Sequence, residues 1–124
     1  MYNGNVINDA TPSRRLLELY QTEWCPSSRR VRQRLTELDV AYVARQVPVE
    51  RDQREELLAR TGDESIPALV CENGDVLVGE EEILAYLDER FPEPEGAEAH
   101  RLKAIKARKR ELEEAARCLE PVMH

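Results

Sequence analysis

The chain has 124 residues, of which 41% are hydrophobic and 35% charged, a composition typical of one globular domain that can bury its own core. Its net charge of -7 argues against nucleic acid and anionic membrane as partners, because both attract basic surfaces. Three widely spaced cysteines and two histidines near the C-terminus leave little for a disulfide framework, a metal site or a histidine-based triad, so we expect no metal.

The first half of the chain alternates strands and helices after a polar segment at 1–14, which we expect to be a flexible leader. The apolar residues of 16–20 predict a short buried strand. A helix is predicted over 26–38, because Pro26 suits the first helical turn and apolar side chains recur at the helical spacing of Val31, Leu35 and Leu38. Alternation over 41–47 predicts a second strand.

The second half begins with a short surface helix predicted at 51–60, which Gly62 helps to end. An apolar strand at 66–71 and a returning strand at 76–78 flank Asn73-Gly74, a strong hairpin signal. Three glutamates open a helix over 80–90, where they complement the positive helix N-terminus. The remaining helix, the C-terminal helix, is long and charged and occupies 97–120.

These elements give the order β-α-β-α-β-β-α over residues 15–92, followed by the C-terminal helix. The first two strands are joined by a helix and should be parallel, whereas the hairpin adds antiparallel strands. We therefore predict an α/β fold with a mixed four-stranded sheet. No apolar run reaches the length of a membrane span and the N-terminus lacks a secretory signal, so the expected location is the cytoplasm.

Cys25 is the residue best placed for chemistry, because it lies between a strand and the helix that opens with Pro26. A thiol there faces unpaired backbone N–H groups and the positive end of the helix, both of which favour the nucleophilic thiolate. Arg29 and Arg30, one turn further on, add positive charge. The competing interpretation is a small core residue, as free cysteine often is. Cys71 falls in an apolar strand and suits that description.

Several segments together resemble the glutaredoxins and the N-terminal domain of glutathione transferases, over about residues 16–91. Cys25-Pro26 with Ser28 resembles a monothiol form of the glutaredoxin active-site segment. Ile66-Pro67 resembles the cis-proline that lies opposite the catalytic thiol. The Asn-Gly turn and the segment 83–87 resemble the end of a transferase N-terminal domain. The resemblance implies a thioredoxin-like fold.

The same resemblance implies a binding site for a small thiol such as glutathione. Ile66 and Pro67 would align the ligand, and Glu80 and Glu81 would hold its amino end. The chain departs from the families at two places, since Gly79-Glu80 replaces the Glu-Ser of transferases and Thr22 replaces a common glutaredoxin lysine. Mycothiol or bacillithiol therefore remain alternatives to glutathione.

The function that we expect is a monothiol, glutaredoxin-like thiol–disulfide oxidoreductase. With Ser28 in place of a resolving cysteine, Cys25 needs an external thiol to resolve its mixed disulfide. The partners would be small thiols and their mixed disulfides with proteins. The alternative is a binding module of the same fold that lost catalysis. A conjugating transferase would continue into a longer helical domain, and an iron–sulfur carrier usually has Cys-Gly-Phe-Ser, so both rank lower.

The C-terminal helix carries a heptad pattern of a and d positions, interrupted by one lysine. The pattern comprises Leu102, Ile105, Lys109, Leu112, Ala116 and Leu119. One interpretation is that these residues pack on the helix's own domain. The other is that they form the interface of a homodimer.

Overall fold

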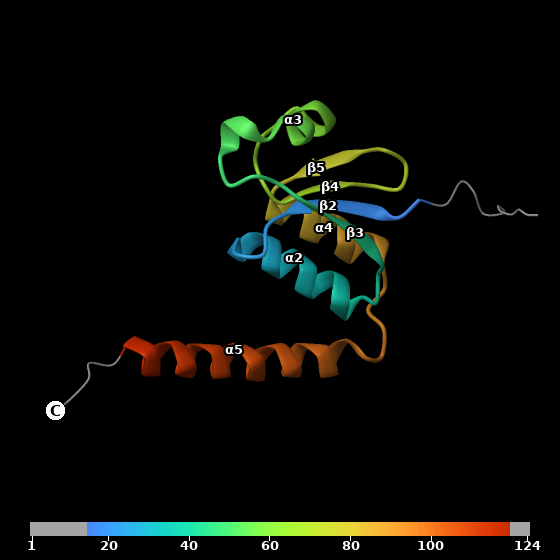
Figure 1. Cartoon of the computed structure of the whole chain (residues 1–124). Coiled ribbons are helices and arrows are strands. Elements are labelled where there is room, and N and C mark those ends of the chain that lie inside the picture. Colours follow the sequence, from blue (N-terminus) through green and yellow to red (C-terminus); the bar gives the residue numbers. More distant parts are fainter. Residues whose placement is uncertain (1–14, 120–124) are drawn as a thin grey trace, which may run out of the picture.

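The computed structural model describes residues 15–119, so the expected leader at 1–14 lies outside the described residues. Its centre is a four-stranded mixed sheet (Figure 1). The strands are β2 (Leu17–Gln21), β3 (Tyr42–Gln46), β4 (Ala68–Val70) and β5 (Val76–Val78), in the order β3-β2-β4-β5. β2 and β3 are parallel and the other pairs are antiparallel, which confirms the predicted sheet.

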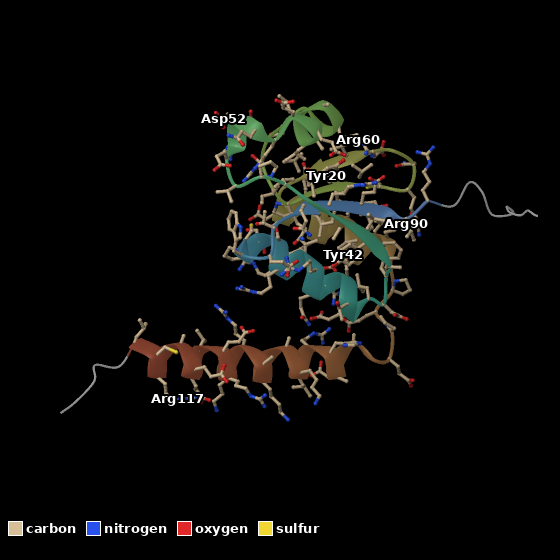
Figure 2. The ribbon with its side chains drawn as sticks, viewed as in Figure 1. Tyr20, Tyr42, Asp52, Arg60, Arg90 and Arg117 are labelled. Atoms are coloured by element: carbon tan, nitrogen blue, oxygen red, sulfur yellow. The ribbon has the colours of Figure 1, made fainter. Side chains whose placement is uncertain are left out.

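Alternating side chains of β2 divide the core between the two faces of the sheet. Leu17 and Leu19 join the larger cluster with α2 (Pro26–Glu37) and α4 (Glu80–Arg90), which lie on one face. Tyr20 points to the other face and packs against Leu57 of α3 (Glu55–Thr61). Figure 2 shows Tyr20 between the sheet and α3. The sequence predicted the thioredoxin-like order of these elements, and the fold confirms it.

The helix predicted over 51–60 is in fact two pieces, a 3-10 turn η1 (Arg51–Gln53) and α3, separated at Arg54. The backbone of Arg54 is not helical, with φ -89° and ψ 61°. The residue is 5% exposed, and its guanidinium donates to the carbonyl oxygens of Pro48, Val49 and Glu64 at 2.8–3.0 Å. These hydrogen bonds hold the arginine inward and explain the break, which hydrophobic spacing does not reveal.

The last helix, α5 (Ala97–Leu119), contacts α2 only near its own beginning. The Gln33 side chain donates to the backbone carbonyl of His100, and Arg101 pairs with Glu37 of α2 and with Glu93. Ala97 is the only buried residue of α5. Figure 1 shows that α5 continues alongside α2 and then extends beyond the N-terminal end of α2. No helix within 15–119 is long and apolar enough to cross a membrane.

Candidate active site

Three segments meet at one edge of the sheet, at the carboxyl end of β2. The pairing of Tyr20 with Ala68 brings the loop after β2 to the residues that precede β4. Ala68 in turn pairs with Val78, so the start of α4 lies at the same edge. The backbone N–H of Gly79 donates to the carbonyl oxygen of Pro67 at 2.9 Å. The topology therefore gathers the loop of Cys25, the segment Ile66-Pro67 and the N-terminus of α4.

Cys25 is the N-cap residue of α2, with extended backbone angles of φ -79° and ψ 119°. Its Sγ accepts a hydrogen bond from the backbone N–H of Ser28 at 3.4 Å, in the manner of an oxygen cap. Pro26 occupies the first helical position, where no N–H is needed. The sulfur is partly exposed. A nucleophile at this cap is both accessible and surrounded by donors.

The surroundings lower the pKa of the Cys25 thiol from its ordinary value. Partial burial is the largest influence and raises the pKa, but several stabilising interactions together outweigh it. They come from the side chain and backbone of Ser28, the backbone of Ser27 and the charge of Arg30. The Ser28 hydroxyl is buried and makes no regular hydrogen bond with a described residue, so it can turn toward a thiolate. The arrangement favours the reactive form of sulfur.

Arg30, rather than Arg29, is the arginine whose charge lowers the thiol pKa. Its guanidinium forms a two-point ion pair with Glu80 at the start of α4, with an Nη2–Oε1 distance of 2.9 Å. The hydrogen bonds from Arg30 lower the pKa of Glu80. Both arginines line a groove between α2 and α5, but only Arg30 also pairs with Glu80. The sequence places both arginines after the cysteine but does not distinguish their directions.

The predicted ligand-aligning residues lie at the same edge as the thiol. The peptide bond between Ile66 and Pro67 is cis, and Pro67 is fully buried. Glu81 is exposed and forms no ion pair with a described residue, whereas Glu80 is bound to Arg30. Of the two predicted glutamates, the carboxylate of Glu80 is therefore ion-paired and that of Glu81 is not, among the residues that the structure describes. Gly79, with φ +100°, caps α4 without a side-chain hydrogen bond.

The other cysteines lie in different surroundings from Cys25. Cys71 is buried in the core cluster under α2 and α4, and burial raises the pKa of its thiol. Cys118 is exposed on α5. All three are free thiols. Over residues 15–119, no three histidine, cysteine or acidic side chains come together in a way that would hold a metal ion.

Trp24 is an exposed aromatic residue beside the thiol that the sequence spacing does not single out. It directly precedes Cys25, and 60% of its surface is exposed. A large aromatic side chain left in solvent beside a reactive group is suited to contact a partner. The sequence does contain a signal for this exposure. Trp24 lies in the loop between β2 and α2, and each of these elements has apolar residues of its own that pack in the core.

Comparison with known proteins places this geometry in context. The family model for the N-terminal domain of glutathione S-transferases matches residues 19–95. A glutathione S-transferase structure from Rhodospirillum rubrum is 32% identical, with a TM-score of 0.55 over 64% of this chain and 35% of that one. A possible transferase from Rhodopseudomonas palustris is 29% identical, with a TM-score of 0.54 over 61% and 38%.

A third structure, a glutathione transferase homologue from Sulfitobacter with bound glutathione, is 25% identical. Its TM-score is 0.54 over 60% of this chain and 36% of that one. The chain therefore spans little more than a third of the length of these three proteins. No curated protein sequence matches the chain.

Proposed function

The chain belongs to the glutathione S-transferase N-terminal domain family, and from this premise we propose that it is a monothiol thiol–disulfide oxidoreductase. Its substrates are mixed disulfides between a protein and a small thiol of the glutathione class. The observation that carries the proposal is the capping geometry of Cys25, whose sulfur accepts from Ser28 N–H and whose pKa is lowered. A thiol in that position is itself the nucleophile.

In the first step the Cys25 thiolate attacks the small-thiol sulfur of the mixed disulfide. A new disulfide forms between Cys25 and the small thiol, and the bond to the protein sulfur breaks. The protein leaves as a thiolate and takes a proton from solvent. The Ser28 and Ser27 backbone and the charge of Arg30 stabilise the attacking thiolate before this step.

In the second step a second small thiol, as its thiolate, attacks the small-thiol sulfur attached to Cys25. Cys25 is released as a thiolate and a disulfide of two small thiols is formed, so one mixed disulfide is reduced to a protein thiol for each free small thiol consumed. An external thiol is required because Ser28 occupies the place one helical turn after Cys25. The buried Cys71 belongs to the core.

The ligand would be held by the edge that surrounds the thiol. The backbone of Ile66, beside the cis bond to Pro67, would pair with the extended ligand, and Glu81 would bind its amino group. The glutathione present in the Sulfitobacter homologue supports this class of ligand. Trp24 would contact the protein half of the mixed disulfide, because it lies exposed beside the sulfur.

A second candidate function, a non-catalytic binding module, is favoured by the ion pair between Arg30 and Glu80. Glu80 stands where transferases place the serine that contacts glutathione, and its carboxylate is already bound. A negative side chain at this position also repels the carboxylate of a glutathione γ-glutamyl group. Weak capture of glutathione with an intact thiol is what this arrangement predicts.

Turnover on a panel of mixed disulfides distinguishes the two functions. The panel contains one model protein thiol joined to glutathione, mycothiol or bacillithiol, each at saturating concentration with the matching free thiol. We expect reduction of at least one of them, and complete loss of that activity in Cys25→Ser. Saturation matters because weakened binding raises KM while leaving the nucleophile competent.

The matched control is Cys118→Ser, which removes an exposed thiol outside the site and should retain full activity. If the protein reduces every mixed disulfide of the panel no faster than the matching free small thiol alone does, the oxidoreductase proposal is wrong. In that case binding of the small-thiol disulfides to Cys25→Ser, measured by calorimetry, would support the binding module.

A further inference from the structure

The outer two thirds of α5 expose a row of large apolar side chains. Leu102, Ile105, Leu112 and Leu119 are between 51% and 83% exposed. Four positions of the heptad pattern, Ile105, Lys109, Leu112 and Ala116, line a groove of about 970 Å³ between α2 and α5. Packing of α5 on its own domain therefore leaves this row, the α5 seam (the heptad positions from Leu102 to Leu119), uncovered.

The charges of α5 are separated along its length. Residues 101–110 contain six lysines or arginines and no acidic residue, whereas 111–114 contain three glutamates. The terminal turns of α5 carry Glu98 and Arg117, as the helix dipole favours, so the dipole does not account for this separation of charge in the interior of the helix. A second helix running in the opposite direction would set each basic half beside an acidic half.

We propose that the α5 seam binds the α5 seam of a second copy of this chain, with the two helices antiparallel. In one register, every position of the seam lies opposite a seam position of the second copy. It sets Leu102 opposite Leu119, Ile105 opposite Ala116, and Lys109 opposite Leu112, each pair taken across the two copies. Every layer then joins an a position to a d position, which is how a and d positions meet across an antiparallel pair. The seam extends over about 26 Å at 1.5 Å per residue.

The same register brings opposite charges together beside the seam. Lys106 and Glu113 both occupy the e position, and an antiparallel pair sets Lys106 of one copy near Glu113 of the other, twice per dimer. Within one chain, neither side chain forms an ion pair with another described residue. A parallel pair would instead place the two basic halves side by side. The charge pattern thus selects the antiparallel arrangement.

Groove and seam lie on the same side of α5, so the second helix would also come to lie beside α2. The part of α2 that lines the groove includes Arg29, Arg30 and Arg34. In the antiparallel register the acidic segment of the second helix lies level with the basic segment of the first, on the side where these arginines are. The seam and the lining of the groove therefore both suit a second copy of α5.

Charge exchange at Lys106 and Glu113 tests the proposal. Sedimentation equilibrium should show a dimer, twice the 14.3 kDa of one chain, in exchange with the monomer. Lys106→Glu and Glu113→Lys should each raise the dimer Kd roughly tenfold, because two attractive pairs become repulsive. The double variant should restore the original Kd. The matched control is Lys103→Glu, the same charge change at a position away from the seam, which should shift Kd less than threefold.

Spin labels give an independent measure of direction. Arg110→Cys and Lys103→Cys occupy equivalent heptad positions, in a background of Cys25→Ser, Cys71→Ala and Cys118→Ser. Labels on the two copies should be offset along the helix axis by about 2 Å at residue 110 and about 22 Å at residue 103. Equal distances at the two positions would overturn the antiparallel arrangement. A single-chain mass up to about 1 mM, or a dimer whose Kd ignores both single charge changes, would overturn the proposal itself.

Discussion

At the scale of single residues, the chemistry depends on how one sulfur is surrounded. Cys25 caps a helix through its own side chain, a task that Ser, Thr, Asp or Asn usually perform. The capping hydrogen bond at once positions the sulfur and stabilises its charge. Arg30 contributes charge from the next turn, while Glu80 binds that arginine and limits its freedom. Reactivity and ligand binding are therefore coupled through one guanidinium.

The first prediction concerns the reactivity of Cys25. Its alkylation by iodoacetamide should reach a plateau at a lower pH than that of a free cysteine, whose pKa is about 8.5, because the site lowers the thiol pKa. Arg30→Gln should shift the plateau to higher pH, and Arg29→Gln should leave it unchanged. Faster alkylation of Cys118 or Cys71 near neutral pH would contradict the assignment of the site.

The second prediction is the effect of the same pKa on stability. An acid whose pKa is lowered by folding stabilises the native state above its unfolded pKa, and this stabilisation is lost as the pH falls through the folded pKa. The free energy of unfolding should therefore increase with pH between these two values, and should increase less in Cys25→Ser. Urea unfolding of both proteins between pH 6 and pH 9 measures the difference. Parallel curves for the two proteins would show that the thiolate is not stabilised.

Sequence reasoning named the residues of the candidate site but not their pairing. Cys25, Pro26 and Ser28 are adjacent in the chain, so their arrangement follows from the start of one helix. The ion pair of Arg30 with Glu80 joins residues 50 positions apart, and only the packing of α2 on α4 brings them together. Side-chain direction of this kind depends on tertiary contacts, which no local pattern encodes.

At the scale of elements, the proposed function makes the ligand preference of the site depend on the start of α4. The third prediction is that Glu80→Ser lowers KM for a glutathione mixed disulfide, because it removes a negative side chain and releases Arg30. Steady-state kinetics over a range of substrate concentrations gives the value. Glu82→Ser is the control, since Glu82 also lies in the first turn but is exposed and forms no ion pair with a described residue. An equal effect of both variants would mean that only net charge matters.

The segment between β3 and β4 depends on Arg54. The fourth prediction is that Arg54→Gln destabilises the protein by about 3 kcal/mol, because three carbonyl groups that hold a buried arginine lose their charged donor. Arg51→Gln, an exposed position with one long contact to Ser65, should change the stability by less than about 0.5 kcal/mol. Urea denaturation of the two variants compares them directly. Similar stability of both would show that water replaces the guanidinium.

The same segment shows where periodicity is a poor guide. The helix was predicted from Leu57 and Leu58 on a charged background, and only Leu57 is buried. An arginine in such a sequence is normally a solvent-exposed residue, and its burial by carbonyl groups cannot be inferred from its neighbours. Strands and helices with several inward residues, such as β2 and α2, were predicted to within a residue of their bounds.

At the scale of the whole molecule, the sheet and its covering helices form a unit to which α5 adds little packing. The sequence predicted this order because each strand or helix carries its own pattern and the connections are short. The family match ends at residue 95, immediately before α5. The position of α5 relative to α2 was not predictable, because it depends on ion pairs of Arg101 rather than on buried apolar area.

The fifth prediction is that a chain ending at Lys103 keeps the stability and thiol reactivity of the full chain. It retains Ala97 and Arg101, which provide the contacts of α5 with the rest of the protein. In dilute solution the free energy of unfolding should change by less than about 1 kcal/mol, since the contacts removed are exposed. Thermal unfolding and Cys25 alkylation measure both quantities. A loss of several kcal/mol would show that the rest of α5 does stabilise the domain.

The presence of Ser28 one turn after Cys25 affects how the protein responds to oxidation by peroxide. A sulfenic acid formed on Cys25 has a hydroxyl group, not a thiol, one turn away, and Cys71 is enclosed in the core. It cannot condense with either of them to a disulfide, so its protection depends on the small-thiol pool of its surroundings. When that pool is depleted, oxidation proceeds to the sulfinic acid, which is not readily reversed. Under the proposed function, the residue beside the sulfur therefore makes the lifetime of the protein depend on the supply of small thiol.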